Sequence, residues 1–221
     1  MPLEVEVLPD RDSVAERGAE HVAELAAAAI AERGRFTFAV SGGNTPWQMF
    51  ADLAGEMPWE KVTIFQVDER VAPDGDEERN LTHLLRALPP GGAADVRAMP
   101  GWADDVEVGA SRYASSLPDR LDLVHLGLGP DGHTASLVPG DPVLDVGDRD
   151  VATTGEYQGR RRMTLTYPAL DRARRILWLV TGEDKADVVR LLRDHDGSIP
   201  AGRVSDERAV LLADEAAASS L

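Results

Sequence analysis

The chain has 221 residues, a formal net charge of −16 at pH 7 and no cysteine. A chain of this length can bury a large core as one domain, and its 43% hydrophobic and 28% charged residues are typical of a folded globular protein. The acidic balance argues against nucleic acids and anionic membranes as partners, and the lack of cysteine excludes disulfides, thiolate-metal sites and cysteine nucleophiles. No signal-peptide pattern opens the chain and no apolar run approaches a membrane span, so we expect a cytoplasmic protein.

Short apolar runs rich in β-branched residues alternate with helical patterns. The first helical pattern is expected to start at an N-cap near Asp12 or Ser13, and a later one carries Val188, Val189 and Leu192 on one stripe. The expected strands are residues 3–8, 36–40, 62–67, 121–128, 149–154, 175–180 and 209–213. This alternation predicts a single α/β domain over residues 1–221, with a mostly parallel Rossmann-like sheet and helices on both faces.

Polar segments follow four of the predicted strands. In chain order they are SGGNTP (41–46), DER (68–70), GLGPDGHT (127–134) and TGEDK (181–185). Ligands of open α/β sheets bind outside the carboxyl ends of the strands, so these segments are expected to converge on one edge.

The third segment contains the pattern G-x-G-x-x-G at Gly127, Gly129 and Gly132. A dinucleotide site would need the third glycine to open a long helix, but Pro139 and Pro142 stop a helix after little more than one turn. A nucleotide cradle is therefore disfavoured, and a catalytic loop is the better interpretation.

His133 is the candidate catalytic group of that loop. The other four histidines lie in predicted helices, inside a strand or beyond a helix end, and no pair has a metal-ligand spacing, so no metal is expected. Asp131, two residues before His133, could orient the imidazole, act itself as acid or base, or only shape the loop.

A candidate anion site lies in the segment from Ser41 to Thr45. Gly42 and Gly43 let backbone N–H groups converge, and Pro46 fits the first turn of a following helix, whose N-terminus favours negative charge. The alternative is an ordinary strand-to-helix turn with Thr45 as N-cap.

Lys185 stands in the first turn of a predicted helix, where a cation opposes the helix dipole. It could share a bound anion there, or merely pair with Glu183 and Asp184. Arg70 and one arginine of the run 160–162 are the other cations that could face the site.

These segments together resemble the 6-phosphogluconolactonase family over nearly the whole chain. SGGNTP resembles its SGGxTP loop, DER its DER triplet, and GLGPDGHTASLVP its G-x-G-x-DGHTASLFP signature. RMTLT resembles its R-[IV]-TLT segment, which selects Arg162, and TGEDK its G-x-x-K. Val138 replaces the usual phenylalanine and Arg79 the serine before Asn80, which leaves the role of Asn80 open.

The resemblance implies a hydrolase without metal or cofactor, which opens 6-phospho-D-glucono-1,5-lactone in the oxidative pentose phosphate pathway. It also implies the fold shared by glucosamine-6-phosphate deaminases, ribose-5-phosphate isomerases and coenzyme A transferases. His133 would be the general base beside Asp131, with Asp68 and Arg70 lining the reacting end. Ser41, Gly42, Gly43, Asn44, Thr45, Arg162 and Lys185 would bind the substrate phosphate. The partner would be a small sugar-phosphate lactone, and the protein a monomer or weak dimer.

Two rival functions share this fold. A glucosamine-6-phosphate deaminase is expected to carry IAFNEP-like residues after its DGH, where this chain has TASLVP. A non-catalytic sugar-phosphate sensor would carry a DNA-binding helix-turn-helix and need no catalytic histidine.

Overall fold

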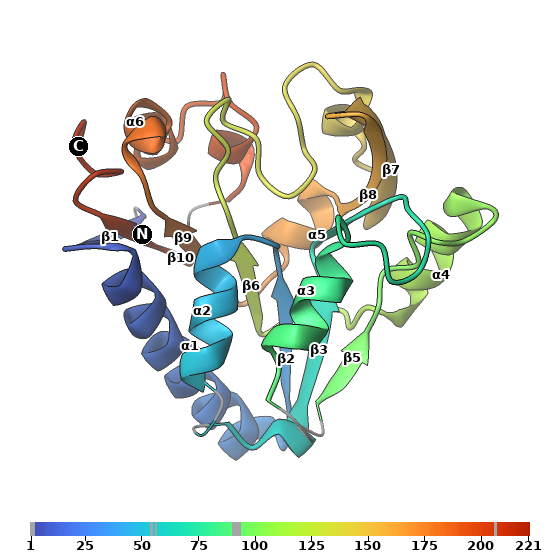
Figure 1. Cartoon of the computed structure of the whole chain (residues 1–221), viewed down its shortest axis with the longest axis horizontal. Coiled ribbons are helices and arrows are strands. Elements are labelled where there is room, and N and C mark those ends of the chain that lie inside the picture. Colours follow the sequence, from blue (N-terminus) through green and yellow to red (C-terminus); the bar gives the residue numbers. More distant parts are fainter. Residues whose placement is uncertain (1–2, 54, 56, 90–93, 206) are drawn as a thin grey trace.

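A computed structural model describes residues 3–53, 55, 57–89, 94–205 and 207–221. Its main sheet has seven strands, and every neighbouring pair is parallel (Figure 1). In spatial order they are β1 (Glu4–Leu8), β10 (Ala209–Asp214), β9 (Ile176–Val180), β6 (Leu123–Leu126), β2 (Phe36–Val40), β3 (Val62–Gln66) and β5 (Asp95–Arg97).

Helices cover both faces of this sheet. The helices α1 (Arg11–Arg33), α2 (Asn44–Leu53) and α3 (Asn80–Ala87) contribute to the apolar core on one face. The helices α4 (Val106–Ser116), α5 (Tyr167–Asp171) and α6 (Ala186–Arg193) contribute to the core on the other. Short 3-10 turns lie at Trp59–Lys61, Pro142–Asp145, Glu183–Lys185 and Ala201–Arg203. The predicted α/β fold, mostly parallel with helices on both faces, is confirmed.

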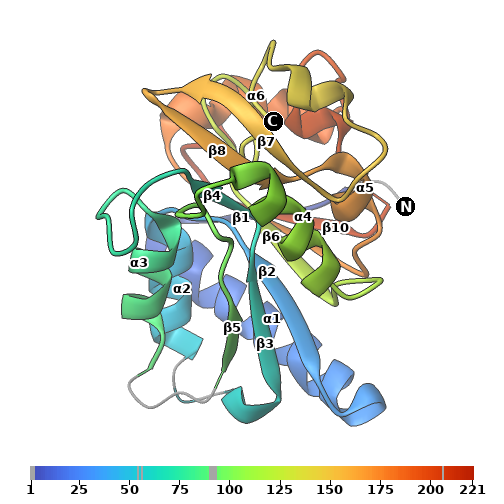
Figure 2. The ribbon, with the colours of Figure 1, turned by 90° about the vertical axis from the view of Figure 1, so that its right-hand side faces the viewer.

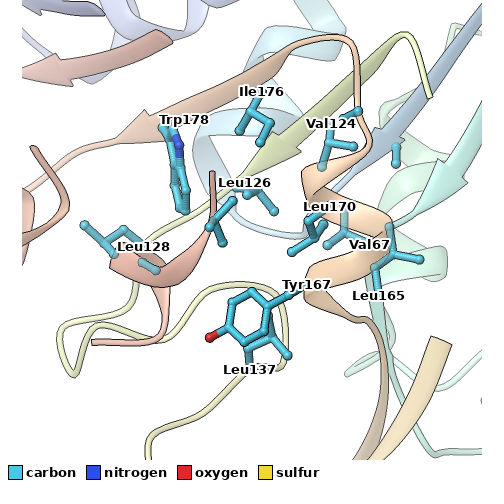
Figure 3. Packing of buried hydrophobic residues seen from close by; sticks show 14 of the residues in the cluster. Val67, Val124, Leu126, Leu128, Leu137, Leu165, Tyr167, Leu170, Ile176 and Trp178 are labelled. Atoms are coloured by element: carbon cyan, nitrogen blue, oxygen red, sulfur yellow. The ribbon is translucent and has the colours of Figure 1, made fainter. Parts of the chain in front are cut away.

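Strand β9 shows why its sequence is apolar throughout. Side chains alternate between the faces of a strand, so Leu177 and Leu179 enter one core while Ile176 and Trp178 enter the other. Figure 3 shows Trp178 and Ile176 beside Val124 and Leu126 of β6.

A second sheet of three antiparallel strands lies beyond the main one (Figure 2). It consists of β4 (Asp68–Arg70), β8 (Arg160–Leu165) and β7 (Val151–Tyr157). The expected strand 149–154 therefore exists as β7 but belongs to the small sheet, and DER is itself a strand. Val67 joins the two sheets, because its N–H donates to Val40 of β2 and its carbonyl accepts from Leu165 of β8.

The predicted N-cap of the first helix is wrong by two or three residues. Asp10 is the N-cap of α1, and its carboxylate accepts from both the backbone N–H and the hydroxyl of Ser13 at 2.8 Å. An aspartate at that place can reach the otherwise unpaired N–H groups of the first turn, which Asp12 inside the helix cannot do. The expected apolar stripe of α6 is confirmed, since Val188, Val189 and Leu192 are buried.

Candidate active site

The site lies where the order of the main sheet reverses. From β2 the chain runs outward through β3 to β5, and it then returns to β6 on the other side of β2. Loops that leave such a neighbouring pair diverge to opposite faces and open a crevice at the carboxyl ends. Here they are the segments 41–46 after β2 and 127–134 after β6. The first segment is tied to β6 by a hydrogen bond from the Ser41 N–H to His125 Nδ1 at 3.3 Å.

Two cavities adjoin one another in this crevice and share the wall formed by Gly42, Gly127 and Leu128. We call the larger one, of about 370 Å³, the lysine lobe; Gly43, Asn44, Thr45 and Lys185 line it. We call the smaller one, of about 150 Å³, the histidine lobe; its lining includes Ser41, Asp68, Arg70, Asn80, His133 and Arg162. In Figure 1, α6 and the β7–β8 hairpin stand on opposite sides of the chain that leaves β6.

Asp131 holds the His133 imidazole through a hydrogen bond to its Nδ1 atom. The Asp131 Oδ1 atom lies 2.5 Å from His133 Nδ1 and also accepts the His133 backbone N–H at 3.1 Å. Partial burial alone would raise the pKa of Asp131, but the hydrogen bonds from His133 lower it below its ordinary range. An ionised carboxylate only accepts, so Nδ1 carries the hydrogen of this bond, and in the neutral imidazole the lone pair is then on Nε2. Asp131 thus orients His133, whereas the imidazole itself lines the histidine lobe.

Gly129 is required by the imidazole. A Cβ atom at Gly129 would lie 2.0 Å from His133 Nδ1 and 2.8 Å from Asp131 Oδ1. The Gly129 N–H donates to the His133 carbonyl, and the Gly132 N–H donates to the Gly129 carbonyl. These amides are used inside the loop and do not cradle a phosphate, so the G-x-G-x-x-G pattern here serves the position of His133.

Strand alternation explains which residues of DER face the histidine lobe. Asp68 and Arg70 share one face of β4 and line the lobe, while Glu69 between them points to the opposite side and is fully buried. The Glu69 carboxylate accepts from the backbone N–H groups of Asn80 and Leu81, which open α3. Glu69 therefore fixes the start of α3 against β4.

Two arginines face each other across β4 and β8. Arg70 pairs in register with Arg162, and both line the histidine lobe. Asn80 accepts from Arg70 Nη1 at 2.5 Å and donates to the Asp68 carboxylate at 3.2 Å. Burial lowers the pKa of the Arg162 guanidinium, and the negative charge of Asp68 partly offsets this shift. The Nε atom of Arg162 has no hydrogen-bond partner among the described residues. The guanidinium thus keeps a buried donor for a ligand.

Arg79, at the position where the resemblance expects serine, is completely buried beside Asn80. Its guanidinium lies 3.5 Å from the Glu69 carboxylate and 2.8 Å from that of Asp74, and it stacks over the ring of Trp102 at 4.6 Å. Removing one partner of such a buried pair is costly because it leaves an uncompensated charge. Arg79 therefore supports β4 and α3 from outside the lobes and leaves Asn80 free to bridge Asp68 and Arg70.

The lysine lobe gathers the N-terminal ends of helices. Asn44 and Thr45 open α2, and Lys185 ends the 3-10 turn that leads into α6. The first N–H groups of a helix have no partner within it, and the helix dipole favours anions at that end. Lys185 lines the lobe and also lies 2.5 Å from the carboxylate of Asp184, which is the pairing that the sequence offered as the alternative to a shared anion.

His125 lies behind the lysine lobe and is fully buried in β6. Burial lowers its pKa to about 3, so the imidazole is neutral. Its Nδ1 accepts the Ser41 N–H, which places the proton on Nε2. Neutral His125 therefore supports the 41–46 turn through this hydrogen bond.

The structure divides the sequence-predicted phosphate residues between the two lobes. Gly43, Asn44, Thr45 and Lys185 line the lysine lobe, Ser41 and Arg162 line the histidine lobe, and Gly42 lines both. Sequence reasoning missed Arg11, which lines the lysine lobe as the first residue of α1. The argument from the helix dipole that selected Lys185 applies equally to Arg11.

Comparison with solved structures shows which known proteins share this fold. A solved 6-phosphogluconolactonase from Shewanella baltica superposes with a TM-score of 0.87 at 25% identity, covering 96% of this chain and 97% of that one. A monomeric glucosamine-6-phosphate deaminase superposes with a TM-score of 0.82 at 21% identity, covering 99% of this chain and 100% of that one, which shows the shared fold.

The family model described as glucosamine-6-phosphate isomerases/6-phosphogluconolactonase matches residues 9–213. The 6-phosphogluconolactonase of Synechocystis sp. is 39% identical over 84% of this chain and 82% of its own length. That of Rattus norvegicus is 36% identical over 92% of this chain and 88% of its own length. The chain therefore belongs to the glucosamine-6-phosphate isomerase/6-phosphogluconolactonase family. Within the described part of the chain, no helix is long and apolar enough to cross a membrane.

Proposed function

We propose that the protein is a 6-phosphogluconolactonase, which hydrolyses 6-phospho-D-glucono-1,5-lactone to 6-phospho-D-gluconate. The observation that carries the proposal is His133, whose Nδ1 is held by Asp131 while its ring lines a small lobe with Arg70 and Arg162. The adjoining lysine lobe supplies the anion site that a phosphorylated sugar requires. Curated relatives with this activity at 36–39% identity support the same conclusion.

His133 is the general base of the proposed reaction. Its Nε2 removes a proton from water as the water oxygen attacks the lactone carbonyl, and Asp131 stabilises the imidazolium that forms. Arg70 and Arg162 are the donors that stabilise the developing oxyanion, because the amides of Gly129 and Gly132 are already used within their loop. The imidazolium then returns its proton to the departing ring oxygen.

The lysine lobe holds the phosphate in this proposal. Backbone N–H groups at the start of α2 and the ammonium of Lys185 bind the phosphate oxygens, and Thr45 contributes a hydroxyl that lies 3.2 Å from that of Thr181. The shared wall of Gly42, Gly127 and Leu128 lets the sugar ring extend from one lobe into the other.

The proposal includes a single catalytic domain that acts without metal or cofactor in the cytoplasm, as a monomer or weak dimer. Each step above uses a side chain of this chain or a water molecule, which is the basis for expecting full activity in the presence of a chelator.

The test is lactone hydrolysis with 6-phosphogluconolactone generated in situ, measured against the spontaneous rate and repeated with a chelator present. We expect a large acceleration that the chelator leaves unchanged. No acceleration above the spontaneous rate would contradict the proposal. Ammonia release from glucosamine 6-phosphate would then indicate a deaminase, and binding of sugar phosphates without turnover would indicate a sensor.

A further inference from the structure

Tyr157, the last residue of β7, reaches across to the loop that carries His133. Its hydroxyl donates to Asp131 Oδ2 at 3.2 Å, while Asp131 Oδ1 accepts from His133. Both oxygens of the Asp131 carboxylate are therefore engaged, one by the small sheet and one by the catalytic loop. A carboxylate held at both oxygens cannot rotate about its Cβ–Cγ bond without losing a hydrogen bond.

The ring of Tyr157 also contacts the residues that line the histidine lobe. Its centroid lies 5.5 Å from that of the His133 imidazole, edge to face at 64°, and the Arg162 guanidinium lies over the ring at 5.0 Å. Such contacts between a cation or an aromatic ring and a tyrosine have defined geometry and modest energy. The side chain thus touches Asp131, His133 and Arg162 together.

The β7–β8 hairpin fixes where Tyr157 stands. The two turn residues, Gln158 and Gly159, have φ angles of 53° and 78°, as a type I′ turn requires, and this turn sets the register of Tyr157 against Arg160. Gln158 in addition accepts from Arg162 Nη2 at 3.2 Å. The tip of the hairpin is therefore built as a rigid support beside the imidazole.

We propose that Tyr157 is a positioning residue for His133, which acts through Asp131 and couples the β7–β8 hairpin to the catalytic loop. The inference rests on the proposed function and adds to it a residue that lies outside every motif shared with the lactonase family. The Tyr157 hydroxyl holds Asp131 in the rotamer that accepts from Nδ1, so that Nε2 points into the histidine lobe. The other charged groups that face His133 are Asp68 and Arg70 of β4 and Arg162 of β8.

The direct test is Tyr157→Phe, which removes the hydroxyl and keeps the ring. We expect kcat to fall about three- to tenfold, the worth of one hydrogen bond, with KM changed less than twofold. The acid limb of the pH–rate profile should move to lower pH, because an Asp131 carboxylate that rotates freely stabilises the imidazolium less. In an Asp131→Asn background the same substitution should cost nothing further, since Tyr157 acts through that carboxylate.

Tyr167→Phe is the matched control. The Tyr167 hydroxyl donates to the Pro200 carbonyl at 3.0 Å in the core, away from both lobes, so its loss should leave the pH–rate profile unchanged. The proposal is overturned if Tyr157→Phe keeps the parent profile, or if its loss of kcat is undiminished in the Asp131→Asn background.

A second readout does not depend on turnover. The ¹⁵N chemical shifts of the His133 ring report which nitrogen carries the proton, and we expect a purer Nδ1–H tautomer in the parent than in Tyr157→Phe. Identical shifts in the two proteins would overturn the role of Tyr157. If the parent hydrolyses no lactone but the shifts differ as expected, the proposed function fails while the coupling of Tyr157 to His133 stands.

Discussion

The lysine lobe and the histidine lobe occupy one crevice but are built in different ways. The lysine lobe consists of the carboxyl ends of parallel strands and the first turns of helices, which every doubly wound sheet provides. The histidine lobe needs a second sheet, because Asp68 and Arg70 come from β4 and Arg162 from β8. The proposed anion site thus depends mainly on local strand-to-helix geometry together with Lys185, whereas the proposed chemistry requires side chains brought together from distant segments. Substitutions in the first lobe should weaken binding, and those in the second should slow the reaction.

The largest effect is expected for His133→Ala. Loss of the proposed general base should lower kcat by roughly 10²–10⁴, while KM should change little because the proposal places the phosphate in the other lobe. Steady-state kinetics on the phosphorylated lactone, corrected for spontaneous hydrolysis, measure both constants. A variant within threefold of the parent kcat would remove His133 from the mechanism.

Lys185→Ala should raise KM by about 10- to 100-fold with little change in kcat, since it removes a charged hydrogen bond to the phosphate. The decisive comparison uses glucono-1,5-lactone, which lacks the phosphate. On that substrate parent and variant should react alike. A Lys185→Ala defect of the same size on both substrates would show that the lysine lobe does not bind the phosphate.

Arg162→Gln tests which of two roles Arg162 has: it binds the phosphate, as the family resemblance implies, or it acts on the reacting carbonyl, as its place in the histidine lobe indicates. The resemblance assigns Arg162 to the phosphate, but the guanidinium lies in the histidine lobe. We therefore expect a loss in kcat of about tenfold on both the phosphorylated and the phosphate-free lactone. If the loss vanishes without the phosphate, Arg162 binds the phosphate and the two lobes share that task.

A separate effect concerns stability instead of activity, and it arises at His125 beside the lysine lobe. The pKa of buried His125 is about 3, far below the value near 6.5 of an exposed histidine, so the unfolded chain takes up this proton first as the pH falls. The free energy of unfolding therefore keeps its full value above about pH 6.5. Between about pH 6.5 and about pH 3 it falls by up to about 1.4 kcal/mol for each pH unit. The free energy of unfolding, measured with denaturant at several pH values, should fall less steeply with decreasing pH in His125→Leu than in the parent. His21, which is half-buried and whose pKa is lowered by that partial burial, adds a decline of the same sign that this variant retains.

The two lobes also differ in how far the sequence predicts them. Strands β2 and β9 carry mostly apolar runs of five residues, and ligands of such sheets bind at the carboxyl ends of the strands, so the 41–46 segment and Lys185 could be placed without any structure. Strand β4 has only three residues, all of them charged, and gives no periodic signal. Its pairing with β8 joins residues that are far apart in the chain, which local patterns do not encode. For the same reason Tyr157, which is hydrogen-bonded from the β7–β8 hairpin to Asp131 of the 127–134 loop, was not predicted from the sequence, and Arg162 was selected only through the family resemblance.

Val67 lies between β3 and β4 and is hydrogen-bonded to both sheets: its N–H donates to Val40 of β2, its carbonyl accepts from Leu165 of β8, and its side chain is fully buried (Figure 3). The small sheet is therefore fastened to the large one at the place where a hinge would have to bend. Substrate should enter a crevice that is already shaped, and association should be limited by diffusion and charge instead of by a closing motion. An acidic surface repels an anionic lactone, so added salt, which screens that repulsion, should speed its capture.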